Sequence, residues 1–262
     1  MKNSKFKLPI SIFIIFSIIF GTAFIVKSTQ ASVVVNLVTK WGSHGGEEIP
    51  SPYGVAVNSV GSVYVTDVGN HRIKKFDPSG NFISAFGSFG SGDGQFNQPY
   101  GVAIDSSDNI YVVDMNNHRI QKFDSSGTYL SQWGSSGSGV NQFVLPIGIA
   151  IDSSDKIYVV DEGSSRIQKF DSSGIYSSFF GSMGSGNGEF VEAYGIAIDS
   201  LDNIYVADAG NHRIQKFDSS FTYLDEWGSH GSGDNQFMYA VGIAIDSSDN
   251  IYTTDIAINR IQ

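Results

Sequence analysis

Short apolar runs alternate with turn residues along nearly the whole chain. Between Gly101 and Gly134 the runs are GVAID, NIYVVD, HRIQKF and TYLSQWG, and Asp, Ser, Asn and Gly separate them. Short runs bounded by such residues are typical of β-strands joined by tight turns. The pattern predicts an all-β chain built from a four-stranded unit.

This unit occurs five times at a constant spacing of 47 residues. Its first strand is marked by Gly54, Gly101, Gly148, Gly195 and Gly242. In the second strand Ile110 and Val112 face one way while Tyr111 and Val113 face the other, so both faces of the sheet need a cover. Tandem repetition of a four-stranded unit predicts a β-propeller, in which neighbouring blades cover each other.

The glycine of the first strand is followed two residues later by alanine in all five copies, as in Gly101 and Ala103. The first strand of a blade lies nearest the axis, where the sheets crowd. Small residues permit a close approach of backbones. We therefore interpret these positions as packing positions at the axis.

The fifth copy ends at Gln262, after its third strand. The complete copies span 54–87, 101–134, 148–181 and 195–228, and the fifth spans 242–262. The segment LVTKWGSHG from Leu37 matches YLDEWGSHG from Tyr223. We predict that residues 33–41 supply the missing outer strand and close a ring of five blades, which would remove an exposed edge. A six-bladed-like or incomplete ring is the alternative.

The N-terminus differs from the rest of the chain. Lys2, Lys5 and Lys7 precede an uncharged run from Leu8 to Val26, a pattern that predicts one hydrophobic helix. We assign residues 1–31 to a signal peptide or a transmembrane signal anchor, and residues 32–262 to the propeller. The propeller is then either held outside the cell membrane or secreted, depending on cleavage.

Charge restricts the partners of the propeller. Four of the 16 Lys and Arg residues lie in residues 1–31, which contain no acid, so 12 basic residues stand against 26 acidic ones in the remainder. Binding to nucleic acid relies on clusters of Lys and Arg, and the propeller has none, so we exclude nucleic acid as a partner. The absence of cysteine excludes disulfides, thiolate catalysis and cysteine zinc sites.

The segments NIYVVDMNNHRIQKFDSSG from Asn109 and NIYVADAGNHRIQKFDSSF from Asn203 resemble the NHL repeat. The resemblance covers about residues 33–262 and implies an extracytoplasmic NHL-repeat β-propeller. Proteins of this family include RNA-binding or substrate-recruiting modules of ubiquitin ligases, extracellular sensor domains of bacterial kinases and a metal-dependent amidating lyase. A common fold therefore leaves the function to be argued from the site.

Several repeated polar positions are interpreted as turn structure. His71, His118 and His212 share one position in three blades, next to an arginine present in all five. Facing aspartates and arginines are expected to orient the same hairpin, as an exposed pair that contributes only about 0–1 kcal/mol each. These structural pairs are Asp67 and Arg72, Asp114 and Arg119, Asp161 and Arg166, Asp208 and Arg213, and Asp255 and Arg260.

Acidic and histidine clusters raise the question of metals. Asp105 with Asp108, and their equivalents in later blades, could bind calcium, but Asp side chains also cap turns without an ion. His44 and His230 follow the same Trp-Gly-Ser sequence and are weak candidates for a metal site. We expect no cofactor, and calcium at the turns stays open.

The links between blades carry the candidate binding residues. Their framing glycines repeat while their tips change, so selectivity for a ligand could reside in Tyr53, Tyr100, Tyr194, Phe96, Phe143, Glu189 and Glu192. The sequence predicts a non-catalytic binding or scaffold module that recognises a protein, peptide or glycan through one face. The alternative is a metal-dependent lyase or hydrolase in the channel, for which Glu162, Glu189 and Glu192 are the acids outside the repeat pattern.

Overall fold

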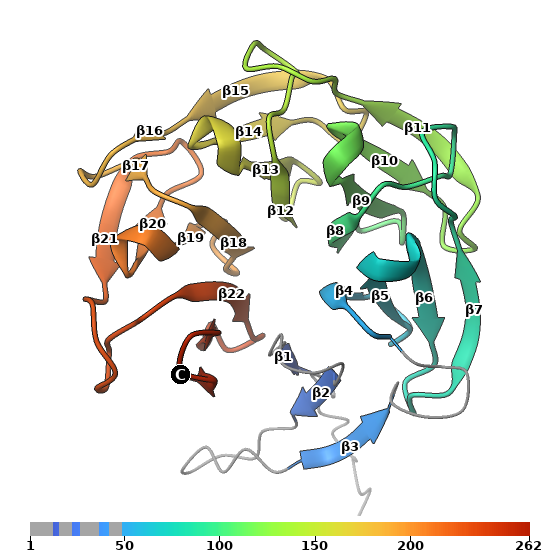
Figure 1. Cartoon of the computed structure of the whole chain (residues 1–262), viewed down its shortest axis with the longest axis horizontal. Helices are drawn as coiled ribbons and strands as arrows, with labels where there is room; N and C mark the ends of the chain where they lie inside the picture. Colours follow the sequence, from blue (N-terminus) through green and yellow to red (C-terminus); the bar gives the residue numbers. More distant parts are fainter. Residues whose placement is uncertain (1–12, 16–22, 27–36, 42–48) are drawn as a thin grey trace, which may run out of the picture.

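The computed structural model describes residues 13–15, 23–26, 37–41 and 49–262. The five repeats form the blades of a β-propeller, arranged around a common axis (Figure 1). The first four blades are antiparallel four-stranded sheets with the strand order β4-β5-β6-β7 and its equivalents. The predicted all-β propeller is therefore confirmed.

The strands recur at equivalent positions in every blade. The inner strands are β4 Pro52–Val57, β8 Pro99–Ile104, β12 Pro146–Ile151, β18 Ala193–Ile198 and β22 Ala240–Ile245. The second strands are β5 Val63–Asp67, β9 Ile110–Asp114, β13 Ile157–Asp161, β19 Ile204–Asp208 and β23 Ile251–Asp255. The third strands are β6 Arg72–Phe76, β10 Arg119–Phe123, β14 Arg166–Phe170, β20 Arg213–Phe217 and β24 Arg260–Ile261. The outer strands are β7 Phe82–Phe86, β11 Tyr129–Trp133, β15 Tyr176–Phe180 and β21 Tyr223–Trp227.

Short 3₁₀ turns join the second strand to the third. They are η1 Val68–Asn70, η2 Met115–Asn117, η3 Glu162–Ser164 and η4 Ala209–Asn211. In the link after the third blade, β16 Ser182–Met183 pairs in parallel with β17 Glu189–Phe190. Because each blade is antiparallel, the links and the 3₁₀ turns lie at one face of the ring, and the turns between first and second strands lie at the other. We call these the link face and the turn face.

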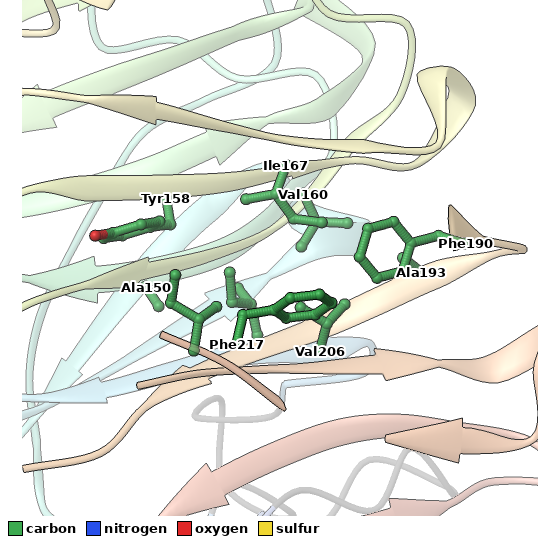
Figure 2. Close-up of a cluster of buried hydrophobic side chains, with 10 residues drawn as sticks. Ala150, Tyr158, Val160, Ile167, Phe190, Ala193, Val206 and Phe217 are labelled. Carbon is green, nitrogen blue, oxygen red and sulfur yellow. The ribbon is translucent and has the colours of Figure 1, made fainter. Parts of the chain in front are cut away.

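The second strand of each blade is buried on both sides, as its pattern predicts. Ile157 and Val159 of β13 belong to a core cluster with residues of the second blade, while Tyr158 and Val160 belong to a cluster with the fourth. Figure 2 shows the latter cluster, where Phe190 from the link and Phe217 from β20 complete the packing. Alternation of side chains thus lets one strand serve two interfaces.

Crowding at the axis is confirmed at the glycines of the inner strands. A Cβ atom there would lie 2.5 Å from the Tyr100 oxygen at Gly54, 2.6 Å from the Ile147 oxygen at Gly101, 2.3 Å from the Tyr194 oxygen at Gly148 and 2.4 Å from the Val241 oxygen at Gly195. Each of these atoms is a backbone carbonyl of the next blade, which cannot move aside as a side chain would. The glycines therefore set the spacing of the blades.

The substitution Gly148→Ala should destabilise the ring, because the added methyl group meets the Tyr194 carbonyl. We expect the free energy of unfolding to fall by about 1–3 kcal/mol, the usual cost of overpacking. Gly69→Ala is the matched control, since its Cβ would lie 3.5 Å from the nearest atom, Ser51 Oγ. Chemical denaturation measures both variants, and equal stability would contradict axial crowding.

The N-terminal strands pair differently from the predicted closure. β3 Leu37–Trp41 pairs with β2 Ala23–Val26, which pairs with β1 Phe13–Ile15. This sheet lies between the fifth and first blades in Figure 1, and β24 is the outermost described strand of the fifth blade. β2 is close to β3 in sequence, whereas β24 lies at the other end of the chain, so pairing with β2 closes a much shorter loop.

The predicted N-terminal helix lies mostly outside the described residues, as do residues 33–36 of the proposed closing strand. The two described segments within the apolar run are the strands β1 and β2. Among the residues that the structure describes, no helix is long and apolar enough to cross a membrane.

Candidate functional site

The Asp–Arg pairs of the second, third and fourth blades are buried, which corrects the expectation of exposed pairs. Arg119 Nε lies 2.7 Å from Asp114 Oδ2, and its guanidinium also donates to the carbonyls of Ser91, Gly92 and Gln95 in the preceding link. Asp114 accepts the Asn97 backbone N–H at 2.7 Å. Equivalent Nε–Oδ2 distances are 2.9 Å for Arg72 and Asp67, 3.0 Å for Arg166 and Asp161, and 2.8 Å for Arg213 and Asp208.

Asp255 and Arg260, the pair of the fifth blade, also hold the preceding link. Arg260 donates to the carbonyls of Ser232 and Gly233, and Asp255 accepts the Met238 backbone N–H at 2.7 Å. In four blades, then, an arginine and an aspartate hold the preceding link against the turn between the second and third strands. Sequence spacing suggested that the pair faces across a hairpin, and only the structure shows its long-range partners in the link.

The repeated histidines are turn residues, as predicted. His71, His118 and His212 follow the 3₁₀ turns with φ angles of 55°, 52° and 57°, and Ser165 occupies the same position at 50°. His71 Nδ1 accepts the Gln98 backbone N–H at 3.0 Å, which helps to fix the next link. These side chains are spread over separate blades.

The acidic turns are capped by their own carboxylates, as the turn interpretation predicts. Asp105 Oδ1 accepts the backbone N–H groups of Ser107 at 3.0 Å and Asn109 at 2.8 Å. Asp152, Asp199 and Asp246 make the same pair of bonds. Hydrogen bonds to backbone thus account for the first acid of every turn.

The second acid of these turns joins neighbouring blades, which sequence reasoning missed. Asp108 accepts the backbone N–H of Ser59 at 2.9 Å and its hydroxyl at 2.8 Å. Asp155, Asp202 and Asp249 bind Ser106, Ser153 and Ser200 in the same way. The recurrence of Ser and Asp at a constant separation of 49 residues was the available signal, but only blade packing gives it meaning.

The predicted proximity of His44 and His230 falls outside the part of the chain that the structure describes. His44 lies outside the described residues, and the ring of His230 lies against His212 at a centroid distance of 4.6 Å. No group of three His, Cys, Asp or Glu side chains that could hold a metal ion occurs within the residues that the structure describes.

Three of the predicted binding residues have structural positions instead. Phe96 and Phe143 are 0% exposed, because the link folds them into the interface between blades, so they are unavailable to a ligand. Glu189 Oε2 accepts the Gly186 backbone N–H at 2.8 Å and caps the link turn, as Gln95 does at Gly92. Phenylalanine recurs at this link position as Phe96, Phe143, Phe190 and Phe237, and this constancy was the available signal of a structural role.

Of the other four predicted residues, Tyr53 and Tyr194 line one cavity on the axis, while Tyr100 packs on Tyr53 and Glu192 is linked to Tyr194 through Tyr239. This cavity has a volume of ≈ 170 Å³. Its walls are the glycines and aliphatic side chains of the inner strands, with Tyr53 and Tyr194 among the lining residues. Both tyrosines stand near the start of their inner strands, so they lie toward the link face. We call this end of the cavity the mouth.

Tyrosines gather at the mouth from several blades. The rings of Tyr53 and Tyr100 have a centroid distance of 4.4 Å, and those of Tyr194 and Tyr239 a distance of 5.7 Å. Burial, followed by the charges of Tyr100 and Tyr194, raises the pKa of Tyr53. Burial likewise raises the pKa of Tyr100, with a contribution from Tyr194. These phenols therefore stay neutral and serve as aromatic faces and hydrogen-bonding groups.

Two carboxylates join this cluster. The Tyr239 hydroxyl lies 2.7 Å from Glu192 Oε2 and 3.0 Å from the Tyr194 hydroxyl. Burial, together with the charges of Glu192 and Asp161, raises the pKa of Glu162. Tyr239 was not predicted, although its position is Glu192, Leu145 or Gln98 in other repeats, and this variation was the available signal.

Family comparison agrees with the fold. An NHL repeat model matches residues 50–76 and 96–123, and a model described as a 6-bladed beta-propeller matches residues 152–227. The chain is an NHL-repeat β-propeller. No curated protein matches its sequence.

Solved structures similar to this NHL-repeat propeller include enzymes. A streptogramin B lyase is 17% identical with a TM-score of 0.61, and the match covers 80% of this chain and 64% of that one. An inactive histidine-to-alanine variant of virginiamycin B lyase from Staphylococcus aureus, with quinupristin, is 15% identical with a TM-score of 0.63, covering 92% and 73%. A gluconolactonase from Xanthomonas campestris is 16% identical with a TM-score of 0.58, covering 78% and 69%. At such identities these likenesses establish the fold alone.

Proposed function

We propose that this propeller is a non-catalytic recognition module that binds a group of a protein, peptide or glycan at the mouth. The observation that carries the proposal is the gathering there of Glu162, Glu192 and Tyr239, which depart from the repeat, beside a tyrosine position that three blades share. Glu162 occupies the position of Val68, Met115, Ala209 and Ile256 in the other blades. A carboxylate in an otherwise apolar position is not required by the blade fold.

The size of the cavity limits what can enter it. An engineered apolar cavity of about 150 Å³ holds one benzene molecule. A cavity of ≈ 170 Å³ therefore accepts one small group, such as a side chain or part of a sugar ring. The remainder of a larger ligand would rest on the links around the mouth.

Enzymatic activity is less well supported by the mouth. The variant of virginiamycin B lyase that lacks one histidine is described as catalytically inactive. The described histidines of this propeller lie in turns and links, and none of them lines the cavity. The raised pKa values of the tyrosines also make them poor bases at neutral pH.

Display outside the membrane is part of the proposal. The basic flank and uncharged run of residues 1–31 support export, with the propeller either anchored or secreted. Its acidic composition supports a partner other than nucleic acid. Protease accessibility of the propeller in intact cells tests the location, and complete protection would contradict it.

The site is tested with panels of peptides and glycans on the purified full-length chain. Tyr194→Ala and Glu192→Ala should each weaken binding of any ligand found by about tenfold or more, as expected for residues at the centre of a site. Asp155→Asn and Asp202→Asn, at the turn face, are the controls and should retain the affinity. Loss of binding in the controls alone would move the site to the turn face.

A further inference from the structure

We infer that the group bound at the mouth is an organic ammonium ion, such as a lysine side chain of a peptide or a small free amine. This inference rests on the proposed function and specifies the ligand of the same site. It follows from the charge, the aromatic faces and the unused hydrogen-bonding atoms around the cavity.

The mouth carries two carboxylates, those of Glu162 and Glu192, that have no counterion among residues 49–262. Glu162 is half-buried, and the charge of Glu192 lies close enough to contribute to its raised pKa. An ammonium ion between the two carboxylates would relieve their repulsion, whereas an anionic ligand would increase it.

The aromatic groups favour a cation as well. Tyr53 and Tyr100 place two rings in contact at the mouth, and a ring face attracts a cation within about 6 Å of its centroid. Tyr53 lines the cavity, and its hydroxyl has no hydrogen-bond partner within residues 49–262. It is therefore free to accept a hydrogen bond from a bound N–H group.

The blades themselves show how an ammonium ion is held by such groups. Lys122 Nζ lies 4.9 Å from the centroid of Tyr111 and 3.7 Å from Asp105 Oδ2. Lys216 repeats the arrangement, at 5.0 Å from Tyr205 and 3.8 Å from Asp199. The mouth has the same tyrosine rings and carboxylates, but the described residues provide no lysine there.

The hydroxyl groups of Tyr194 and Tyr239 form a chain of hydrogen bonds that ends at the Glu192 carboxylate. A hydroxyl has one proton, so when Tyr239 donates to Glu192 it accepts from Tyr194. This chain holds Glu192 in place, and the other carboxylate oxygen of Glu192 accepts no hydrogen bond from residues 49–262. The site is then organised before a ligand arrives, which lowers the entropic cost of binding.

Three blocked peptides with Lys, norleucine or Glu between two glycines test the inference on the full-length chain in nonionic detergent. NMR titration at about 0.15 M salt should show that the lysine peptide binds roughly tenfold more tightly than the norleucine peptide. The glutamate peptide should not bind measurably. Cadaverine, as a free diamine, separates the sources: similar affinity indicates a small amine, and weaker affinity indicates a peptide lysine.

Substitutions of residues at the mouth test whether the lysine peptide binds there. Glu162→Gln and Glu192→Gln should each reduce affinity for the lysine peptide roughly tenfold, and Tyr53→Leu should reduce it more than Tyr53→Phe. Asp234→Asn removes one exposed carboxylate from a link and is the matched control, with unchanged affinity. An equal loss in the control would show that overall charge attracts the peptide, which overturns the inference.

Failure of the inference is distinguishable from failure of the proposed function. If a neutral or acidic peptide or a glycan binds in a manner sensitive to Tyr194→Ala and the lysine probes do not, the ammonium inference is overturned and the binding function stands. If nothing in either panel binds in that manner, both are overturned.

Discussion

Replacing Arg119 by methionine should lower the free energy of unfolding by about 3–5 kcal/mol, the usual loss when one member of a buried ion pair is removed. The Asp114 carboxylate is 0% exposed and would keep its charge without the guanidinium. The carbonyls of Ser91, Gly92 and Gln95 would each lose one hydrogen bond at the same time, although Gly92 keeps the Gln95 backbone N–H and Gln95 keeps the Gln121 side chain as donor. Urea denaturation followed by circular dichroism measures the change.

Arg72→Met is the matched control for this variant. It occupies the same repeat position, but its side chain is 33% exposed, against 8% for Arg119. Solvent can partly replace the lost partner there, so we expect a clearly smaller loss of stability. Equal losses for the two variants would contradict the expectation that burial of the arginine sets the size of the loss.

Acidification should destabilise the propeller steeply below about pH 4. Hydrogen bonds from the turns lower the pKa of Asp77, Asp124 and Asp218, with the Asn81 side chain, the Ser126 side chain and the Thr222 backbone N–H as the largest causes. A lowered pKa in the folded state means that the unfolded chain binds protons first. The stabilisation is therefore complete above the ordinary value of 3.8 and is lost as the pH falls through the lowered values.

Melting temperatures measured from pH 7 to pH 2 test this dependence. Asp124→Asn should lower the melting temperature at pH 7 and leave it unchanged at pH 2, so that its profile is flatter. Glu162 should act with the opposite sign, because its pKa is raised: its contribution is present at low pH and is lost as the pH rises above about 4.5. If the melting temperature of Asp124→Asn changed with pH in parallel with that of the unsubstituted protein, the stabilising role of the turn carboxylates would be contradicted.

The effect of substituting Glu162 on the melting temperature can distinguish a binding role of this residue from a structural one. Its raised pKa shows that the ionised carboxylate is unfavourable in the folded chain without a ligand. Glu162→Gln should therefore hold or raise the melting temperature at pH 7, whereas substitution of a residue that serves the fold lowers it. Residues kept for function commonly have this cost in stability.

The repeat pattern alone determined the blades of this protein. A spacing of 47 residues, four apolar runs and glycine in the first run were enough to predict the strands, the two-sided burial of β13 and the crowding at Gly148, because these properties depend on period and residue size. Capping by Asp105 was also predictable, since it acts within one turn.

Tertiary structure decided what each side chain of the links does. Phe96 and Tyr100 both lie near the end of a variable link, yet one enters the blade interface and the other reaches the mouth. The partners of Arg119 and the pairing of Tyr239 with Glu192 join residues of different repeats. Such contacts depend on how blades are placed about the axis, and the period of a sequence carries no information on that placement.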